Sequence, residues 1–444
     1  MSRFDVYLFR GGAFNFMMAN LWYAAWLGSD GAGGNRARLR RELDRLQGMK
    51  VSSVRILASS EGCLDSSPIC PWSMTPAMQV APGKYDHHLL VGLDFAIMEL
   101  EKRGMVGVLV LNSMMPASGG IAQYVEWAGG PAAPAPTLDA FAKGAAAWNK
   151  LRFFTQASRF FDMPKAVQLS HNHIRFLLTR RNSYTGRLYG HDPTIMSWEL
   201  ANAPRPMGRL LPYRQWVTST AKLVKRLAPK HLVTIGSEGA HAALAEDWKG
   251  KGLPKYGWEP DVSDFELDHK LEGIDYASCQ LWIEPWGWHN QTSEGDSGLP
   301  RAIERARQYL VAHVNAAVRI GMPLVISEVG FGRDGGRFAA TADVKRRNLF
   351  LDAIFKEVQA SVAKRDALSG VGFSGWSGEG RVSWRAGALP IWHPGDKLLA
   401  DSRSDPQGLY SVYDKDASTI NLIRSYAERW SQPSQPKPDG RRQQ

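Results

Sequence analysis

Eight short apolar stretches alternate with longer amphipathic stretches along almost the whole chain, and this alternation restricts the fold more than any other feature. Each apolar stretch is nearly continuous and ends in polar residues, as expected for parallel strands that are covered on both faces. The eight predicted strands are 14–22, 51–60, 105–113, 194–202, 232–239, 274–282, 323–330 and 371–378.

The amphipathic stretches predict helices between and after these strands. They are 36–49, 88–104, 165–181, 213–228, 301–321, 343–364 and 418–430, and the helix of the fifth unit is the least clear. Repeated β-then-α units predict the α/β class and a closed (β/α)₈ TIM barrel in a single domain. A doubly wound open sheet is the alternative, but no Gly-rich phosphate turn follows an early strand.

The chain has 444 residues with 44% hydrophobic content, which is enough for one large core. We assign residues 1–430 to the barrel. The Pro- and Ala-rich segment 129–139 is expected to be a loop on the catalytic face, and the polar tail 431–444 is expected to be disordered.

The formal net charge is +11, but Lys and Arg are interleaved with acidic residues on helices such as 36–49. This pattern is typical of solvated helix faces, so we expect no nucleic-acid partner.

No apolar run approaches the roughly 20 residues of a membrane span, so no membrane partner is expected either. The N-terminus lacks the features of a signal peptide, and the compartment is left open. We expect a monomer.

Three cysteines, Cys63, Cys70 and Cys279, are too few for a disulfide framework. Cys63 and Cys70 could close a small loop in an oxidising compartment. No cluster of Cys and His has the spacing of a zinc site, and we expect neither a metal nor a cofactor.

In a barrel of this kind, the functional residues lie where strands end and the following loops begin. No Ser/His/Asp set is found there, because the His residues lie mostly on helices or loops. The most conspicuous residue is Glu328, a carboxylate at the end of an apolar strand, which could also be structural and pair with Arg55. The residues at the strand ends are Asn20, Trp22, Tyr23, Arg55, Ser59, Ser60, Glu61, Asn112, Ser113, Asn202, Ala203, Ser237, Glu238, Gln280, Trp282, Glu328 and Trp376.

From residue 14 to the final helix, the chain is similar to the β-mannanases and exo-acting β-mannosidases of glycoside hydrolase family 5. The similarity is carried by "NLWYAAWLG", "NRARLRRELDRL", "VRILASSE", "SGGIAQYVEWAGG", "RRNSYTGRLYGHDPTIMSWELAN", "PRP" and "SEVGFGRDGG". It implies a β-linked, mannan-like oligo- or polysaccharide as the partner, with no cofactor.

The resemblance also implies a retaining mechanism, in which one carboxylate attacks the anomeric carbon and a second carboxyl group donates and later accepts a proton. Glu328 would be the nucleophile, and Arg55 beside it would keep it ionised. Asn202 would bind the 2-hydroxyl of the sugar, and Trp376 would form the floor of the subsite. Gln280, Trp22 and Trp282 complete the expected substrate-binding set.

The acid/base position falls on Ala203, because the family motif Asn-Glu-Pro reads Asn202-Ala203-Pro204 in this chain. Alanine has no proton to give. Glu199 faces the same side of its strand but would lie about 13 Å deeper, so we expect it to be structural. The strand-six residue Gln280 and the loop 114–117 also depart from the family pattern, which favours natural drift over an engineered substitution.

Two functional hypotheses follow. The first is a β-mannan-directed retaining glycoside hydrolase, similar to mannan endo-1,4-β-mannosidase, whose hydrolysis is weakened, rerouted or lost at Ala203. The alternative is a carbohydrate-binding pseudoenzyme that holds a β-linked oligosaccharide without cleaving it. A structural protein without a ligand would require the Trp-lined mouth of the barrel to be blocked.

Overall fold

A computed structural model describes residues 8–9, 12–13, 15–63, 67, 70–134, 150–240, 263–364, 366–385, 389–403 and 405–430. The predicted tail 431–444 and the second half of the predicted loop 129–139 lie outside the described residues.

Eight parallel strands form the barrel, and each lies beside its neighbour in the sequence. They are β3 (Phe16–Asn20), β4 (Ser53–Leu57), β7 (Val106–Val110), β8 (Ile195–Glu199), β9 (Leu232–Thr234), β10 (Ala277–Leu281), β11 (Leu324–Val329) and β12 (Leu368–Phe373). The ring joins at β9 and β10 through backbone hydrogen bonds from Asp275 to Val233 and from Gln280 to Glu238. The predicted single-domain (β/α)₈ TIM barrel is therefore confirmed.

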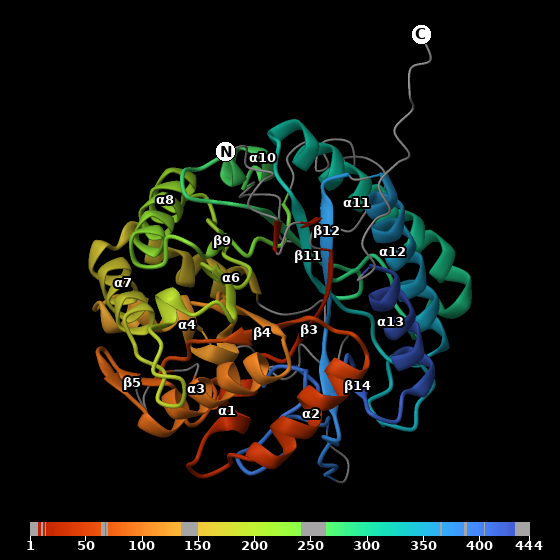
Figure 1. The fold of residues 1–444 in the computed structure, drawn as a ribbon, viewed down its shortest axis with the longest axis horizontal. Helices are drawn as coiled ribbons and strands as arrows, with labels where there is room; N and C mark the ends of the chain where they lie inside the picture. The colour runs from red at the N-terminus through yellow and green to blue at the C-terminus, as the bar shows by residue number, and fades with distance from the viewer. Residues whose placement is uncertain are drawn as a thin grey trace.

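Helices surround the barrel on its outside (Figure 1). All seven predicted helices are present, as α2 (Arg36–Gly48), α3 (His87–Lys102), α7 (Pro164–Leu178), α8 (Leu210–Leu227), α11 (Gly295–Ile320), α12 (Lys345–Lys364) and α13 (Ala417–Trp430). Helix α2 begins where the Asn35 side chain accepts a hydrogen bond from the Arg38 amide. Helix α11 ends at Gly321, which has the left-handed φ of 65° that favours glycine.

Shorter elements lie in the connections. They are β1 (Leu8–Phe9), β2 (Gly12–Ala13), α1 (Ala24–Gly28), β5 (Gln79–Ala81), β6 (Lys84–Tyr85), α4 (Gly120–Trp127), α6 (Lys150–Ala157), α10 (Phe265–His269), β13 (Trp376–Gly378) and β14 (Val412–Tyr413). In the loop after β4, Cys63 and Cys70 form a disulfide, so the proposed pair is correct, and Cys279 is buried and free.

The eighth strand differs from its prediction. The run 371–378 was expected to be one strand, but β12 ends at Phe373 and Trp376–Gly378 forms the separate strand β13. β13 leaves the barrel and pairs with β14. As a consequence, the residue that follows the last barrel strand is Ser374, and Trp376 lies beyond it.

The strands separate two apolar cores. A small cluster fills the base of the barrel and contains Phe16, Met18, Val108, Met196, Leu232, Tyr276 and Val325. The main core lies between the strands and the helices. Above the small cluster, Glu199 and Glu328 are buried near the carboxyl ends of their strands, and Arg55 in the middle of β4 pairs with both. The fold therefore gathers polar groups toward one end of the barrel.

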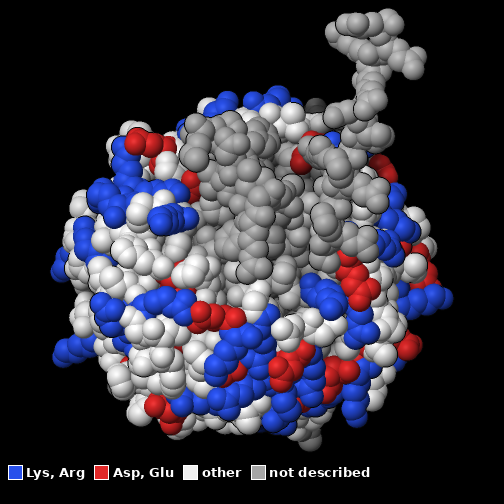
Figure 2. Space-filling view, in the orientation of Figure 1, with Lys and Arg blue, Asp and Glu red and all other residues white. Residues whose placement is uncertain are grey.

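The distribution of charged residues on the surface agrees with the prediction of solvated helix faces. In the lower part of Figure 2, where α2 lies, Lys and Arg are interspersed with Asp and Glu. Arg41 of α2, for example, pairs with Glu379 through two hydrogen bonds. No helix among the described residues is both long enough and apolar enough to cross a bilayer.

Candidate active site

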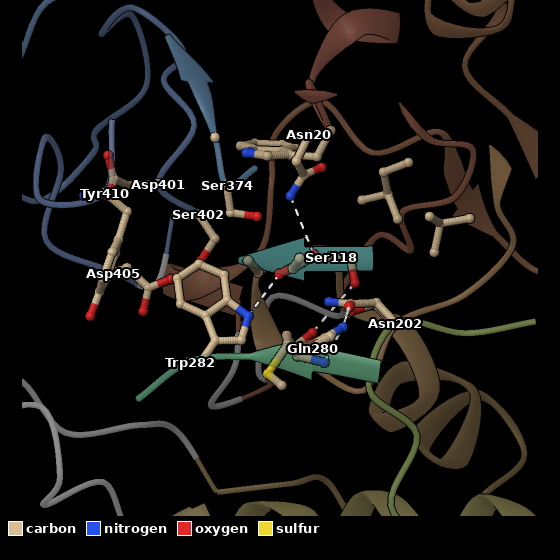
Figure 3. A pocket seen from close by; sticks show the side chains of 18 of the residues that line it. Asn20, Ser118, Asn202, Gln280, Trp282, Ser374, Asp401, Ser402, Asp405 and Tyr410 are labelled. Carbon is tan, nitrogen blue, oxygen red and sulfur yellow. Dashed lines mark hydrogen bonds between the residues drawn. The ribbon is translucent and has the colours of Figure 1, made fainter. Parts of the chain in front are cut away.

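A cavity of about 210 Å³ opens at the carboxyl ends of the barrel strands (Figure 3). It is lined by Asn20, Trp22, Arg55, Leu57, Met74, Val110, Ser113, Met115, Ala117, Ser118, Phe154, Asn202, Arg205, Glu238, Gln280, Trp282, Pro285, Trp286, Glu328, Ser374, Gly375, Ala400, Asp401, Ser402, Asp405 and Tyr410. Most of the expected site residues therefore meet in one place. In the described part of the chain, no group of three or more His, Cys, Asp or Glu side chains is arranged to hold a metal ion.

Glu328, on β11, is 6% exposed and accepts hydrogen bonds from three directions. The side-chain Nδ2 of Asn20 donates to Oε1 at 3.3 Å, and the Trp282 indole N–H donates to Oε2 at 2.9 Å. The Arg55 guanidinium also pairs with Oε1. These donors hold both carboxylate oxygens in fixed positions, as a nucleophile requires.

Burial raises the pKa of Glu328, and Arg55 opposes this shift without overcoming it. Arg55 lies beside Glu328 as predicted and favours its ionised form, but its effect on the pKa does not outweigh that of burial. Arg55 also pairs with both oxygens of Glu199, so one guanidinium is shared by two buried carboxylates. Glu199 is 1% exposed and does not line the cavity, which agrees with its expected structural role.

Asn202 is held by two donors that fix the orientation of its side-chain amide. Arg55 donates to Asn202 Oδ1 at 3.0 Å, and Gln280 Nε2 donates to the same oxygen at 2.9 Å. Its Nδ2 has no partner among the described residues, so the N–H groups on the cavity side are available to a ligand. Gln280, expected only as a substrate-binding residue, thus also positions Asn202.

Ala203 is fully buried and does not line the cavity. Its amide N–H donates to the Gly236 carbonyl at 2.9 Å, and its backbone has a left-handed φ of 51°. The side chain offers no polar or ionisable atom. Neither Ala203 nor its neighbour Asn202 can therefore supply a proton to a departing group.

The aromatic residues of the site are divided between the cavity wall and the core. Trp22 and Trp282 line the cavity as expected, and the Trp282 ring packs edge-to-face against Tyr410 with 5.0 Å between ring centroids. Trp376 does not line the cavity. It is fully buried, and its indole N–H donates to Glu42 on α2 at 3.0 Å.

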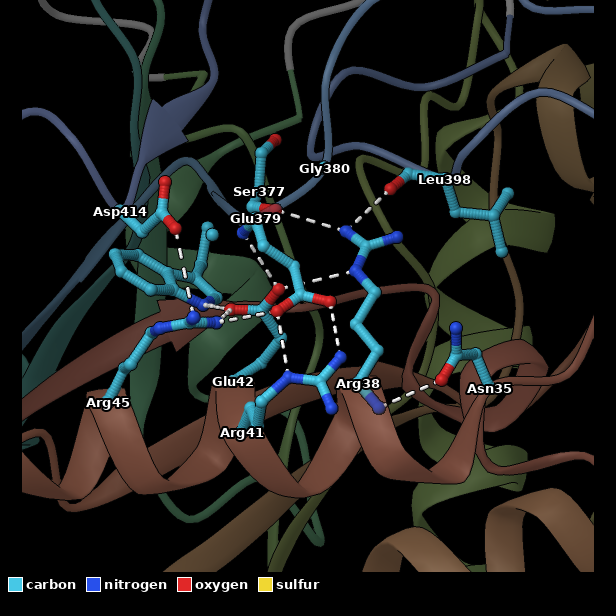
Figure 4. Close-up of polar contacts among 12 residues, drawn as sticks. Asn35, Arg38, Arg41, Glu42, Arg45, Ser377, Glu379, Gly380, Leu398 and Asp414 are labelled. Atoms are coloured by element: carbon cyan, nitrogen blue, oxygen red, sulfur yellow. Dashed lines mark hydrogen bonds and ion pairs between the residues drawn. The ribbon is translucent and has the colours of Figure 1, made fainter.

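Figure 4 shows the polar network around Glu42, where Arg38, Arg45 and the Glu379 amide also meet this carboxylate. A side chain enclosed in this way cannot form the floor of a subsite. The predicted role of Trp376 is therefore corrected. The cavity residues nearest to it in the sequence are Ser374 and Gly375.

With this geometry established, comparison with known proteins identifies the family. The model of the family described as "GH family 5 beta-mannosidase-like" matches residues 4–435. The chain belongs to glycoside hydrolase family 5.

Solved and curated relatives agree with this assignment. A family 5 mannosidase from Rhizomucor miehei has 29% identity and a TM-score of 0.81, with 95% of this chain and 94% of that chain covered. A mutant of the same enzyme was solved in complex with mannosyl-fructose, at 29% identity and a TM-score of 0.80, covering 94% of this chain and 93% of that one. Mannan endo-1,4-beta-mannosidase 3 from Oryza sativa subsp. japonica is 31% identical over 67% of this chain and 57% of its own length.

The matched part of this family 5 chain spans 57% to 63% of the length of the first three rice relatives. The endo-1,4-β-mannosidase activity in their names belongs to those longer proteins.

Sequence reasoning missed the loop between β13 and β14, which supplies Ala400, Asp401, Ser402, Asp405 and Tyr410 to the site. Burial raises the pKa of Asp401 to about 6. Its carboxylate accepts hydrogen bonds from the amides of Gly408 and Tyr410, both at 2.8 Å, and from Ser411 Oγ at 2.5 Å. Asp401 thereby fixes the backbone that carries Tyr410. No periodic pattern marks this loop in the sequence.

The second missed feature of this family 5 site is an ion pair between Arg205 and Glu238. Arg205 Nε donates to Glu238 Oε2 at 2.6 Å, and Arg205 Nη2 lies 2.6 Å from the same oxygen. The guanidinium also lies 4.3 Å from the centre of the Phe154 ring. The available signals were the "PRP" motif and the position of Glu238 at a strand end. Neither signal indicated that the two residues meet in the wall of the cavity.

Proposed function

We propose that this protein is a β-mannan-directed retaining glycoside hydrolase in which Glu328 is the nucleophile and the acid/base position is occupied by Ala203. The observation that carries the proposal is the set of donors on Glu328, from Asn20, Arg55 and Trp282, at the base of an open cavity. Family membership supports mannose-containing β-linked chains as the substrate class.

Loss of the acid/base group affects both halves of a retaining mechanism. In the first half, the sugar hydroxyl that departs is a poor leaving group unless it is protonated. In the second half, water must lose a proton as it attacks. A positioned acid/base group contributes about 10²–10⁴-fold in rate, so hydrolysis of native mannan is expected to be slower by roughly that factor than in an enzyme with both carboxyl groups.

The test compares an activated aryl β-mannoside with mannan, each with and without azide. An aryl oxide leaves without protonation, and azide attacks the glycosyl–enzyme without needing a base. We expect turnover of the aryl mannoside, faster with azide, and slow cleavage of mannan. The matched control is Glu328→Gln, which keeps the shape of the side chain and removes the nucleophile. If neither substrate reacts in any condition, the hydrolase proposal is wrong.

The second candidate function is carbohydrate binding without cleavage. It is favoured by the fully buried methyl group at position 203, together with a wall that contains Trp22, Trp282 and Tyr410. Indole and phenol rings offer apolar faces on which sugar rings can pack.

Titration calorimetry with manno-oligosaccharides tests binding separately from catalysis. Trp282→Ala is expected to weaken binding, whereas Trp384→Ala should leave it unchanged, because Trp384 is 58% exposed and does not line the cavity. Failure of the parent protein to bind any β-linked oligosaccharide would remove this candidate.

A further inference from the structure

Besides Glu328, three carboxylates line the cavity: Glu238, Asp401 and Asp405. Asp401 already accepts three hydrogen bonds that hold its own loop. Asp405 accepts a hydrogen bond from Ser402 and lies on the side of the cavity near Trp282 and Tyr410, well apart from Asn202 (Figure 3). In the described part of the chain, Glu238 is thus the lining carboxylate that remains for chemistry on the Asn202 side.

The backbone of Glu238 is fixed between two strands of the site. It follows β9, which lies next to β8, and the Ala203 amide donates to Gly236 two residues earlier. On its other side, the Gln280 amide of β10 donates to the Glu238 carbonyl at 3.2 Å. Glu238 therefore lies between the strand that leads to the missing acid/base residue and the strands that carry Gln280 and Glu328.

The side chain of Glu238 is anchored through only one of its oxygens. Arg205 Nε donates to Oε2 and Nη2 contacts the same oxygen, whereas Oε1 has no hydrogen-bond partner among the described residues. The ion pair with Arg205 holds the carboxylate in place, and Oε1 is left to accept a hydrogen bond from a water molecule. Burial raises the pKa of Glu328, and the charge of Glu238 raises it further, so the two carboxylates interact across the site.

We propose that Glu238 is the general base for the second half of the reaction, in place of the residue missing at position 203. This inference rests on the proposed role of Glu328 as the nucleophile. In this step, a water molecule transfers a proton to Glu238 while its oxygen bonds to the anomeric carbon. The bond between that carbon and Glu328 breaks, and its electron pair returns to Glu328 as the carboxylate. Glu238 then releases the proton to solvent.

With Glu238 in this role, the second half of the reaction has a base, whereas the first half still lacks an acid. An ion-paired carboxylate accepts a proton but is a poor proton donor, so Glu238 assists the attack of water and does little for the leaving group. The expected substrates are therefore β-mannosides whose leaving group departs without protonation. On such substrates, the protein should turn over without any added anion.

The experiment is stopped-flow kinetics of dinitrophenyl β-mannoside with Glu238→Gln, which keeps the size of the side chain and one oxygen for Arg205. We expect a rapid burst of one dinitrophenolate per molecule, followed by a steady rate that is lower than in the parent protein by about 10²–10⁴-fold. Azide should restore the steady rate and yield mannosyl azide. Glu272→Gln is the matched control, because this side chain is 74% exposed and pairs with Lys222 on the surface.

Each outcome is decisive. A steady rate equal to that of the parent protein, or a burst slowed as much as the steady rate, would overturn the role of Glu238 while leaving Glu328 as the nucleophile. No dinitrophenolate from the parent protein, with or without azide, would remove the proposed function together with this inference. Glu238→Asp guards against misfolding, because it keeps a carboxylate and should retain more turnover than Glu238→Gln.

Discussion

Replacing Arg55 by Gln tests the charge balance on which the proposed site depends. Arg55 is 3% exposed and is shared by Glu199, Glu328 and Asn202. The variant Arg55→Gln leaves two buried carboxylates without their cation. Removal of one partner from a buried ion pair typically costs about 3–5 kcal/mol of unfolding free energy, and we expect a loss of this size at pH 7.

The loss should become smaller at lower pH. Burial already raises the pKa of Glu328, and the variant removes Arg55, which opposes that shift. A folded-state pKa above the unfolded value of about 4.3 means that the folded variant binds protons that the unfolded chain does not bind. Through Glu328, the stability of the variant therefore rises as the pH falls from the raised pKa toward 4.3, by up to about 1.4 kcal/mol per pH unit.

The assay is urea unfolding of the parent and the variant at pH 7 and pH 5, followed by tryptophan fluorescence. The control is Arg41→Gln, which removes an equally bidentate pair with Glu379, but one on the surface where solvent screens it. The control should show little change and no dependence on pH. If Arg55→Gln is as stable as the parent at pH 7, or loses equal stability at both pH values, the buried charges do not depend on Arg55 as we argue.

Three further predictions concern other parts of the chain. Ala203→Glu should speed the cleavage of manno-oligosaccharides by up to about 10²–10⁴-fold in a reducing-sugar assay, and an unchanged rate in a folded variant would place the acid/base position elsewhere. The pKa of Asp401 is raised from 3.8 to about 6 by burial, so the stability of the parent should fall as the pH rises from about 4 to 6. Thermal unfolding at several pH values should show that Asp401→Asn lacks this fall in stability between about pH 4 and 6. Opening the Cys63–Cys70 disulfide, whose cysteines are seven residues apart, with Cys70→Ser should cost roughly 2.5 kcal/mol in urea unfolding, and no loss would contradict the loop-entropy account.

The roles of the site residues were assigned from the resemblance to known enzymes. Some of these residues could also be placed in the site from their positions along the predicted strands. Glu328 and Asn202 lie at or just beyond the ends of apolar strands, Arg55 lies within one, and parallel strands of a barrel bring their carboxyl ends together. For these residues, the order of strands was enough to predict that they meet. Trp376 was assigned in the same way and failed, because β12 ends three residues before it and β13 carries it into the core.

The sequence by itself determined the barrel, the seven principal helices, the carboxylate at position 328 and the absence of one at position 203. These follow from periodicity and residue identity, which are local properties. Only the tertiary structure decided that Asp401 and Tyr410 border the cavity, and that Arg205 meets Glu238 across two loops. Such contacts join segments that carry no periodic pattern, and their proximity is set by closure of the whole ring of strands rather than by any stretch of the chain.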